Sequence, residues 1–478
     1  MEKYLKTIQK FLPALSVISF CIITFFIMMT HGFIPREDEA HAWTIAENTT
    51  ISQLIDLMNV EGHFLIWYLI IRPFAKLNLL YPYPMFFINW IITIIAVVIL
   101  WKKAPFNNFI KLLITFSAPI MNLYAVQPRC YSVGIALLFG ALSIYNEKLK
   151  HPYMYLTFLV LTANTSAPMC IVSGILGLMF LYDYFRENKD KWNQNHNIFI
   201  IITISVVILN LILFYFQFCN VSMPNYEKTS IIKAPYFIAA YLGLKNDLPL
   251  TDLLKMIPLW IGTIIFPIAF FRNKHAFIFF VSSEIITLLF FTFVYEARVH
   301  HVCLLYIFAI AAYWIFCLDT NVKSRLIHVS FIVLLIFMTI LPIKYKPPEY
   351  GIVLDEIVAD KNLNTSSLYT NIPPISLSPI IPIMNKNGTT FYDMSGVDLA
   401  SYEGLKEYFS QNIHVNPDSF ASILDKNKEN YIILQGYFSD NKILGKKYSF
   451  EVDLYEIIPF KNKFNGIYVY KVKNIKSY

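Results

Sequence analysis

The interpretation of this chain turns on the stretch Pro35-Arg36-Glu37-Asp38-Glu39-Ala40-His41-Ala42-Trp43. The stretch follows an apolar run, 11–29, that is long enough to cross a bilayer as an uncleaved helix, and five of its nine residues can ionise. Proline in the first turn of a helix costs no hydrogen bond, and the helix dipole favours acids there. The pattern predicts that a helix starts just outside a membrane. An ordinary helix start explains these acids as well as a catalytic site does.

The composition of the whole chain is that of a polytopic membrane protein. Of its 478 residues, 56% are hydrophobic, 17% are aromatic and only 15% are charged, and the mean hydropathy is +0.51. A soluble domain cannot bury so much apolar surface, whereas lipid can cover it. The net charge of +7 comes from Lys and Arg scattered between apolar segments. That distribution is typical of cytoplasmic loops and argues against a nucleic-acid partner.

Apolar segments separated by polar loops predict about eleven transmembrane helices. They cover 11–29, 85–101, 109–124, 132–146, 153–165, 168–185, 197–218, 253–271, 275–294, 301–318 and 326–343. The Lys- and Arg-rich connections all fall on one side, which the positive-inside rule assigns to the cytoplasm. The outer side then carries residues 30–84, 125–131, about 219–252, 295–300 and the chain after 343.

The first outer loop, 30–84, is expected to hold juxtamembrane helices. Residues 64–80 are apolar but include Arg72, Pro73 and Lys76, and counting them as a span would invert every later loop. They are therefore predicted to form a helix on the outer surface. Residues 51–59 have amphipathic helical spacing and are predicted to lie on the same surface.

The chain divides into a membrane domain, 1–343, and a small soluble α/β domain, 344–478, which is predicted to be extracytoplasmic. After Tyr345 the sequence is richer in Asn, Asp, Lys and Ser and contains no apolar run of membrane length. Short β-type runs predict strands at 367–370, 389–392, 431–434 and 466–472. Helical spacing occurs at 351–360 and at about 397–410.

Four short motifs bring ionisable side chains to the predicted outer face: 37–41, 61–63, 127–131 and 295–301. Each has an ordinary explanation on its own, such as a helix cap or an arginine that snorkels at a membrane edge. Paired histidines could hold a metal, although neighbouring residues on a helix point apart. Together the motifs favour an outward cavity where Arg and His hold a lipid phosphate. A carboxylate there could take a proton from an acceptor, an effect worth roughly 10²–10⁴-fold in rate.

The motifs resemble those of the GT-C superfamily of membrane glycosyltransferases, in particular the protein O-mannosyltransferase and aminoarabinose-transferase branch. Asp38-Glu39-Ala40 followed by Trp43 looks like the Asp-Glu-Ala start of that branch. The sequence 61–68, EGHFLIWY, is similar to its His-Pro-Pro-Leu-Tyr-Tyr element without the prolines, and 127–132, QPRCYS, resembles its Glu-Ala-Arg-x-Tyr element. Arg298 is placed like the family's arginine for the lipid phosphate.

The resemblance implies a GT-C-like fold and transfer of a sugar from a polyprenyl-phosphate donor, with inversion, to an extracytoplasmic acceptor (lipid, glycan or protein). Asp38 would be the general base, and Glu39 would shape the site or hold a divalent metal where one is used. The implied location is a bacterial plasma membrane crossed many times, with the active site on its outer face. Candidate substrate-binding residues are His41, Glu61, His63, Arg129, Tyr131, Arg298, His300 and His301.

Two other classes of protein remain open from the sequence. A transporter or lipid flippase of the cell-envelope glycan pathway could line a pathway with the same charges, but such proteins usually carry intramembrane charges and matching broken helices. Here Glu284 is the main charge within a span, and no repeat is visible. A polysaccharide polymerase or ligase would share the lipid substrate but not the early acidic loop.

Overall fold

The computed structural model describes most of the helical region and parts of the C-terminal region. From the helical region it describes residues 2–61, 64–77, 79–189, 193–218, 268, 270–293, 299–319 and 325–340. From the C-terminal region it describes residues 367–370, 381–382, 390–393, 397–401, 405, 424, 430–435, 442–444, 448–459 and 466–477.

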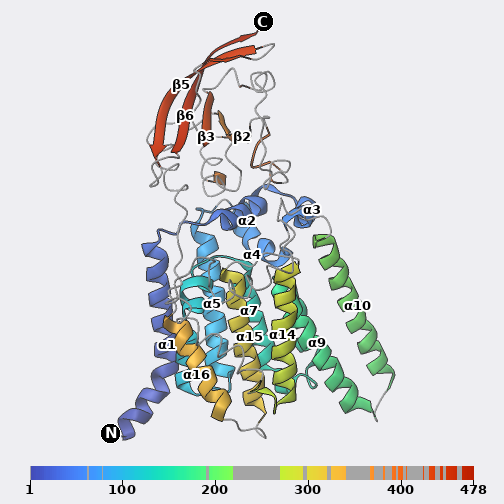
Figure 1. The fold of residues 1–478 in the computed structure, drawn as a ribbon. Helices are drawn as coiled ribbons and strands as arrows, with labels where there is room; N and C mark the ends of the chain where they lie inside the picture. Colours follow the sequence, from blue (N-terminus) through green and yellow to red (C-terminus); the bar gives the residue numbers. More distant parts are fainter. Residues whose placement is uncertain are drawn as a thin grey trace.

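Apolar helices form a bundle (Figure 1). They are α1 (Glu2–Thr30), α5 (Tyr83–Lys103), α6 (Asn108–Thr115), α7 (Cys130–Ser143), α8 (Pro152–Ala163), α9 (Ala167–Asn188), α10 (Gln194–Phe218), α14 (Lys274–Phe293), α15 (Val299–Leu318) and α16 (Arg325–Ile340). Among the described residues, six helices are long and apolar enough to cross a membrane: α1, α5, α9, α10, α14 and α15. This architecture is consistent with a polytopic helical membrane protein. The predicted span 253–271 lies almost entirely outside the described residues, so the expected total of eleven stays a prediction.

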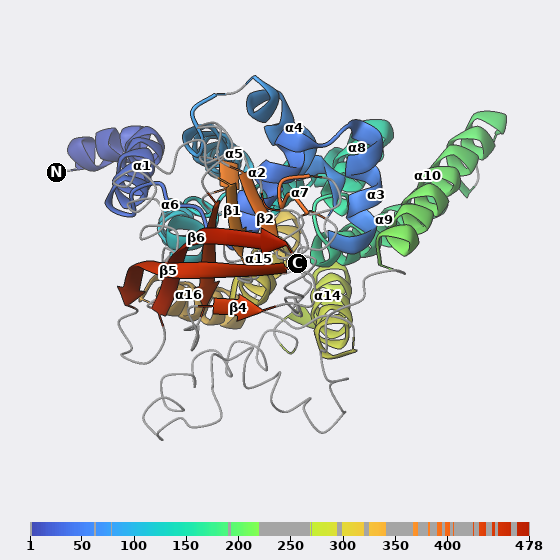
Figure 2. The same cartoon turned by 90° about the horizontal axis from the view of Figure 1, so that it is seen from above.

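The buried share of the helices decreases from the centre of the bundle to its edge. The apolar window of α15 is 83% buried, whereas that of α10, at the edge of the bundle in Figure 2, is 11% buried. Large apolar side chains on the peripheral helices, such as Phe26 of α1 and Leu211 of α10, are each 59% exposed. Lipid rather than protein is the environment that suits these faces.

The segment 109–124, predicted as one span, is two elements. Helix α6 ends at Thr115, and a π-helical turn, η1 (Pro119–Tyr124), follows. Pro119 has no backbone N–H to donate to the carbonyl of Thr115, so one α-helical hydrogen bond is lost where α6 ends. Ser117 reinforces the break because its hydroxyl donates to the Ile114 carbonyl at 2.8 Å.

Three short helices gather at one end of the bundle, which we call the α2 end (Figures 1 and 2). They are α2 (Glu37–Asn48), α3 (Ile51–Glu61) and α4 (Leu65–Lys76). With 12 residues, α4 is too short to span a bilayer, in line with its predicted surface position. Arg72, a charged residue in this apolar helix, caps the C-terminus of α2. It donates to the backbone carbonyls of Ala46, at 3.1 Å, and of Thr49, at 2.5 Å.

The C-terminal region contains a six-stranded sheet in the order β2-β1-β3-β6-β5-β4, which lies beyond the α2 end in Figure 1. Strand β1 is parallel to β2 and β3, and the remaining pairs are antiparallel. The strands are β1 (Ser367–Thr370), β2 (Thr390–Asp393), β3 (Asn430–Gln435), β4 (Lys442–Leu444), β5 (Tyr448–Pro459) and β6 (Gly466–Ser477).

All four predicted strands are present, while β4 and β5 were not predicted. The helix predicted from about 397 does not begin there, because Asp398 bridges to Tyr392 and the next residues turn. Burial raises the pKa of the Asp398 carboxyl, while hydrogen bonds from the Ala400 and Ser401 backbones oppose the rise. The predicted helix 351–360 lies outside the described residues.

Candidate functional site

The acidic stretch forms the first turn of α2, as its sequence predicted. The helix begins at Glu37, and Glu37, Asp38 and Glu39 all lie in the first turn. The backbone N–H of Arg36 donates to Glu39 Oε2 at 2.6 Å, which closes the helix start. Local capping therefore accounts for one of the two Glu39 oxygens.

The second Glu39 oxygen joins α2 to the segment before α7. Glu39 Oε1 accepts hydrogen bonds from Gln127 Nε2 at 2.8 Å and from Arg129 Nε at 3.0 Å. The Glu39 side chain is completely buried. A buried carboxylate is tolerated because charge-assisted hydrogen bonds replace its hydration. Glu39 thus acts as an anchor within the site.

Arg129 connects three elements. Its Nη2 lies 2.8 Å from Asp38 Oδ2, and its Nη1 lies 3.2 Å from His300 Nε2 at the start of α15. Guanidinium nitrogens cannot accept, so this last hydrogen bond requires His300 Nε2 to be the acceptor. Burial alone would lower the pKa of the Arg129 guanidinium, but the Asp38 and Glu39 carboxylates outweigh it and raise that pKa well above its ordinary value.

A polar residue inside α5 fixes the turn that carries Arg129. Asn89 Nδ2 donates to the carbonyls of Tyr124, at 2.9 Å, and of Ala125, at 3.1 Å, while its Oδ1 accepts from Ser132 at 2.6 Å. Turn η1 leaves carbonyls that regular α-helical hydrogen bonds do not satisfy. Asn89 satisfies two of them and so positions the following loop, 127–129.

His41 and Glu61 form a second pair at the α2 end. His41 Nε2 lies 2.7 Å from Glu61 Oε1, and both side chains are more than nine-tenths buried. The pair links α2 to the end of α3, which brings together two motifs that are twenty residues apart. His63, from the same motif as Glu61, lies outside the described residues.

Asp38 and Arg129 border a hollow at the surface of the bundle. Its volume is about 350 Å³, including the space open at its mouth. The Asp38 side chain is 30% exposed, against 10% for Arg129. Asp38 is therefore the accessible carboxylate of the site. The hollow is lined by Asp38, Glu39, Ala42, Phe64, Trp67, Tyr68, Pro128, Arg129, Cys130 and Tyr131.

Tyr68 lines the hollow, and the rings of Tyr131, His300 and His301 form an aromatic group beside it. Burial, together with the Glu61 carboxylate, raises the pKa of the Tyr68 phenol well above its ordinary value, so the phenol remains protonated. The Tyr131 ring lies 5.4 Å from the His300 ring and 5.7 Å from the His301 ring. The ring centroids of His300 and His301 are 4.1 Å apart. The Tyr124 hydroxyl donates to the backbone carbonyl of His300 at 2.9 Å.

The structure thus brings seven of the candidate site residues to the α2 end around α2, α7 and α15. They are Asp38, Glu39, His41, Glu61, Arg129, Tyr131 and His300. His301 packs beside them through its ring contacts. Arg298 lies outside the described residues. Among the residues that are described, no group of three or more His, Cys, Asp or Glu side chains is placed to hold a metal ion.

Sequence reasoning missed Asn89, Gln127 and Tyr68 as members of the site. A single Asn within an otherwise apolar span is a signal that could have found Asn89, because uncompensated polar groups are costly there. Gln127 and Tyr68 lie within quoted motifs, but their contacts depend on packing between distant segments.

No protein-family model matches the chain, and no curated protein matches it significantly.

Proposed function

We propose that this chain is a membrane glycosyltransferase of the GT-C type that uses a polyprenyl-phosphate sugar. The observation that carries the proposal is the partly exposed Asp38 carboxylate, held by Arg129 at the edge of an aromatic-lined hollow. A carboxylate in such a position can act as a general base. The bundle beside it offers apolar faces to which a polyprenyl chain can bind.

In the proposed reaction, Asp38 takes the proton from an acceptor hydroxyl. The acceptor oxygen then bonds to the anomeric carbon as the bond from that carbon to the phosphate oxygen breaks, which inverts the configuration and releases polyprenyl phosphate. Glu39 and Gln127 hold Arg129, and Arg129 holds the base in place. This assigns Arg129 mainly to positioning, since three of its nitrogens already contact protein groups.

The proposed orientation puts this site outside the cytoplasm. Support comes from the opposite end of the bundle, where Lys102 and Lys103 close α5 and Lys274 opens α14. Basic residues at membrane-helix ends favour the cytoplasmic side. The acceptor would then reach Asp38 from the extracytoplasmic phase.

The test is to compare lipid-linked sugars and glycans, by mass spectrometry, in cells with and without the gene. We expect one defined modification to disappear with the gene and to return with the wild-type protein. Asp38→Asn should fail to restore it at an equal level of membrane-inserted protein. Glu37→Gln, which removes another carboxylate from the same helical turn, is the matched control and should restore it. Full restoration by Asp38→Asn would remove the central claim.

One observation favours a transporter as the second candidate. Glu284 lies within α14 and is only 7% exposed, beside the fully buried Ser283 and Thr287. Ionisable groups inside a span commonly mark ion or substrate pathways. Substrate flux across proteoliposomes without sugar transfer, abolished by Glu284→Gln, would favour this function over the glycosyltransferase.

A further inference from the structure

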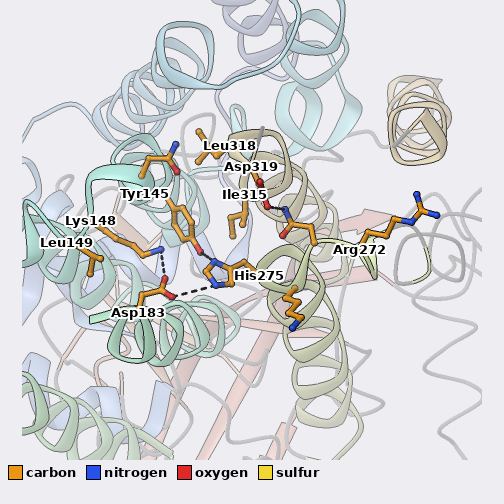
Figure 3. Close-up of a pocket in the computed structure, with 12 residues that line it drawn as sticks. Tyr145, Lys148, Leu149, Asp183, Arg272, His275, Ile315, Leu318 and Asp319 are labelled. Carbon is orange, nitrogen blue, oxygen red and sulfur yellow. Dashed lines mark hydrogen bonds and ion pairs between the residues drawn. The ribbon is translucent and has the colours of Figure 1, made fainter. Parts of the chain in front are cut away.

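A second polar cavity lies at the other end of the bundle (Figure 3). It forms between the turn after α7, the last part of α9, the start of α14 and the end of α15, with a volume of about 1080 Å³ including its open mouth. His300 and Leu318 mark the two ends of α15, and a rise of 1.5 Å per residue separates them by about 27 Å. The cavity is therefore distinct from the Asp38 site.

One wall of this cavity is a connected polar chain (Figure 3). Lys148 Nζ lies 2.8 Å from Asp183 Oδ2, and His275 Nε2 lies 3.5 Å from Asp183 Oδ1. The other nitrogen of the His275 ring is 3.4 Å from the Tyr145 hydroxyl. Lys148 also sits over the Tyr145 ring, 3.6 Å from its centroid. The Lys148 ammonium is consequently fixed in position and directed along the wall.

The start of α14 adds positive charge to the cavity. Arg272, Lys274 and His275 flank Asn273, whose Oδ1 accepts from the Ala276 backbone N–H at 2.9 Å as a helix N-cap. A helix dipole is positive at this end and opposes basic side chains. The Asp319 carboxylate offsets only part of this positive charge, with its Oδ2 accepting from Asn273 Nδ2 at 3.2 Å. Within the part of the chain that the structure describes, neither Arg272 nor Lys274 makes an ion pair.

The charge on Lys148 is also incompletely compensated. Burial lowers the pKa of its ammonium more than the Asp183 carboxylate raises it. A second anion near Lys148 would offset the cost of burying its positive charge. Leu149, Ile315 and Leu318 supply apolar surface on the cavity lining.

We propose that this cavity binds a phosphate ester, with Lys148 and Lys274 as cationic partners. Arg272 extends away from the Lys148 wall in Figure 3, so it is assigned to attraction of the ligand at the rim. Asp183 and Asp319 would repel a bare anion but can accept from hydroxyl groups. The ligand class is thus a phosphate ester that carries hydroxyl groups, either a phospholipid headgroup or a soluble ester.

Two probes separate the two sources. Glycerol 3-phosphate, titrated into the purified full-length protein in uncharged detergent, tests the soluble ester by calorimetry. Phosphatidylglycerol and phosphatidylcholine nanodiscs, followed by native mass spectrometry of the retained lipid, test the headgroup. Selective retention of phosphatidylglycerol without binding of glycerol 3-phosphate would assign the lipid, and binding of glycerol 3-phosphate would assign the soluble ester.

Variants decide whether the cavity is responsible. The double variant Arg272→Gln/Lys274→Gln changes two exposed side chains and should weaken binding by about tenfold or more, as expected when charge-assisted contacts are lost. Lys102→Gln/Lys103→Gln removes two exposed lysines from the last turn of α5 and should bind like the wild type. Equal binding by the first variant, an equal loss in the control, or no binding of either probe to the wild type would overturn the proposal. None of these readouts depends on sugar transfer.

Discussion

Arg129 Nη2 lies 2.8 Å from Asp38 Oδ2 and ties the start of α7 to the first turn of α2. Through its Nε the same guanidinium reaches the buried Glu39 at 3.0 Å. One planar group therefore orients two neighbouring carboxylates, of which only Asp38 is accessible. An arginine suits this position because its donors form a rigid fork, whereas a lysine offers a single charged nitrogen.

Arg129→Lys should retain the membrane-inserted fold but lower the proposed transfer by about tenfold or more. The charge remains to balance Glu39, while the geometry that orients Asp38 is lost. The measurement is the abundance of the modification identified by mass spectrometry, normalised to protein in the membrane.

Arg129→Met provides the comparison for stability. It leaves the buried Glu39 without its guanidinium, and breaking such a pair typically costs about 3–5 kcal/mol. Unfolding in detergent by added denaturant should show this loss for Met and a smaller one for Lys. Wild-type transfer by Arg129→Lys would mean that the fork does not position Asp38.

The His41–Glu61 pair should contribute coupling energy between α2 and α3. A double-mutant cycle with His41→Gln and Glu61→Gln is expected to give about 0.5–3 kcal/mol, the range measured for residues in direct contact. The 2.7 Å separation and the burial of both side chains place the pair in that class. Additive losses in unfolding free energy would show that the pair stabilises nothing beyond its separate contacts.

The start of α2 could be predicted from the sequence because its signals are local. Three acids soon after a proline predict a helix start, and the helix does begin at Glu37. Pro35, expected in the first turn, lies instead one residue before the N-cap, Arg36. The contacts of Arg129 are different, since they depend on how α2, α7 and α15 pack. Sequence placed these residues on one predicted face, but it could not show that Arg129 contacts acids instead of leaving its guanidinium open to a phosphate.

Strand β5 shows a similar limit in the C-terminal region. Its Phe450, Val452 and Leu454 alternate with Glu451 and Asp453, a period-2 pattern that favours a strand, although the two acids lower the intrinsic β propensity of the segment. The register with β6 places Glu451 opposite Lys473 and Asp453 opposite Lys471. This pairing depends on a partner strand that comes later in the chain. The interruption at Pro119 is different, because the proline that indicates it lies within the segment itself. It was missed because the segment 109–124 was assigned as one span from its continuous apolar character.

Replacement of Asn89 should impair the site through η1. Asn89→Leu removes the Asn89 donor from the Ala125 carbonyl, at about 1–3 kcal/mol for a buried group left unsatisfied. The Tyr124 carbonyl and the Ser132 hydroxyl each lose one partner but keep Thr93 Oγ1, at 3.3 Å, and the Arg129 carbonyl, at 3.2 Å. We expect faster hydrogen exchange over 119–129 and reduced transfer. Asn164→Leu is the control, because it removes a hydrogen bond to Asn210, 2.6 Å long, that lies away from the site. It should leave hydrogen exchange over 119–129 unchanged. Unaltered exchange in Asn89→Leu would contradict the supporting role.

Gly134 should not tolerate a methyl group, because α7 packs closely at that position. A Cβ there would lie 2.7 Å from Thr165 Oγ1 and 2.9 Å from Met169 Cγ, and both of these residues are fully buried. Overpacking of this kind typically costs about 1–3 kcal/mol, more than alanine gains over glycine in helix propensity. Gly174→Ala in α9 is the matched control, since a Cβ there meets nothing within 4 Å, and it should leave stability unchanged or raise it by up to about 1 kcal/mol. Denaturant unfolding in detergent measures both variants, and equal stability of the two would show that the α7 contact can relax to accept the methyl group.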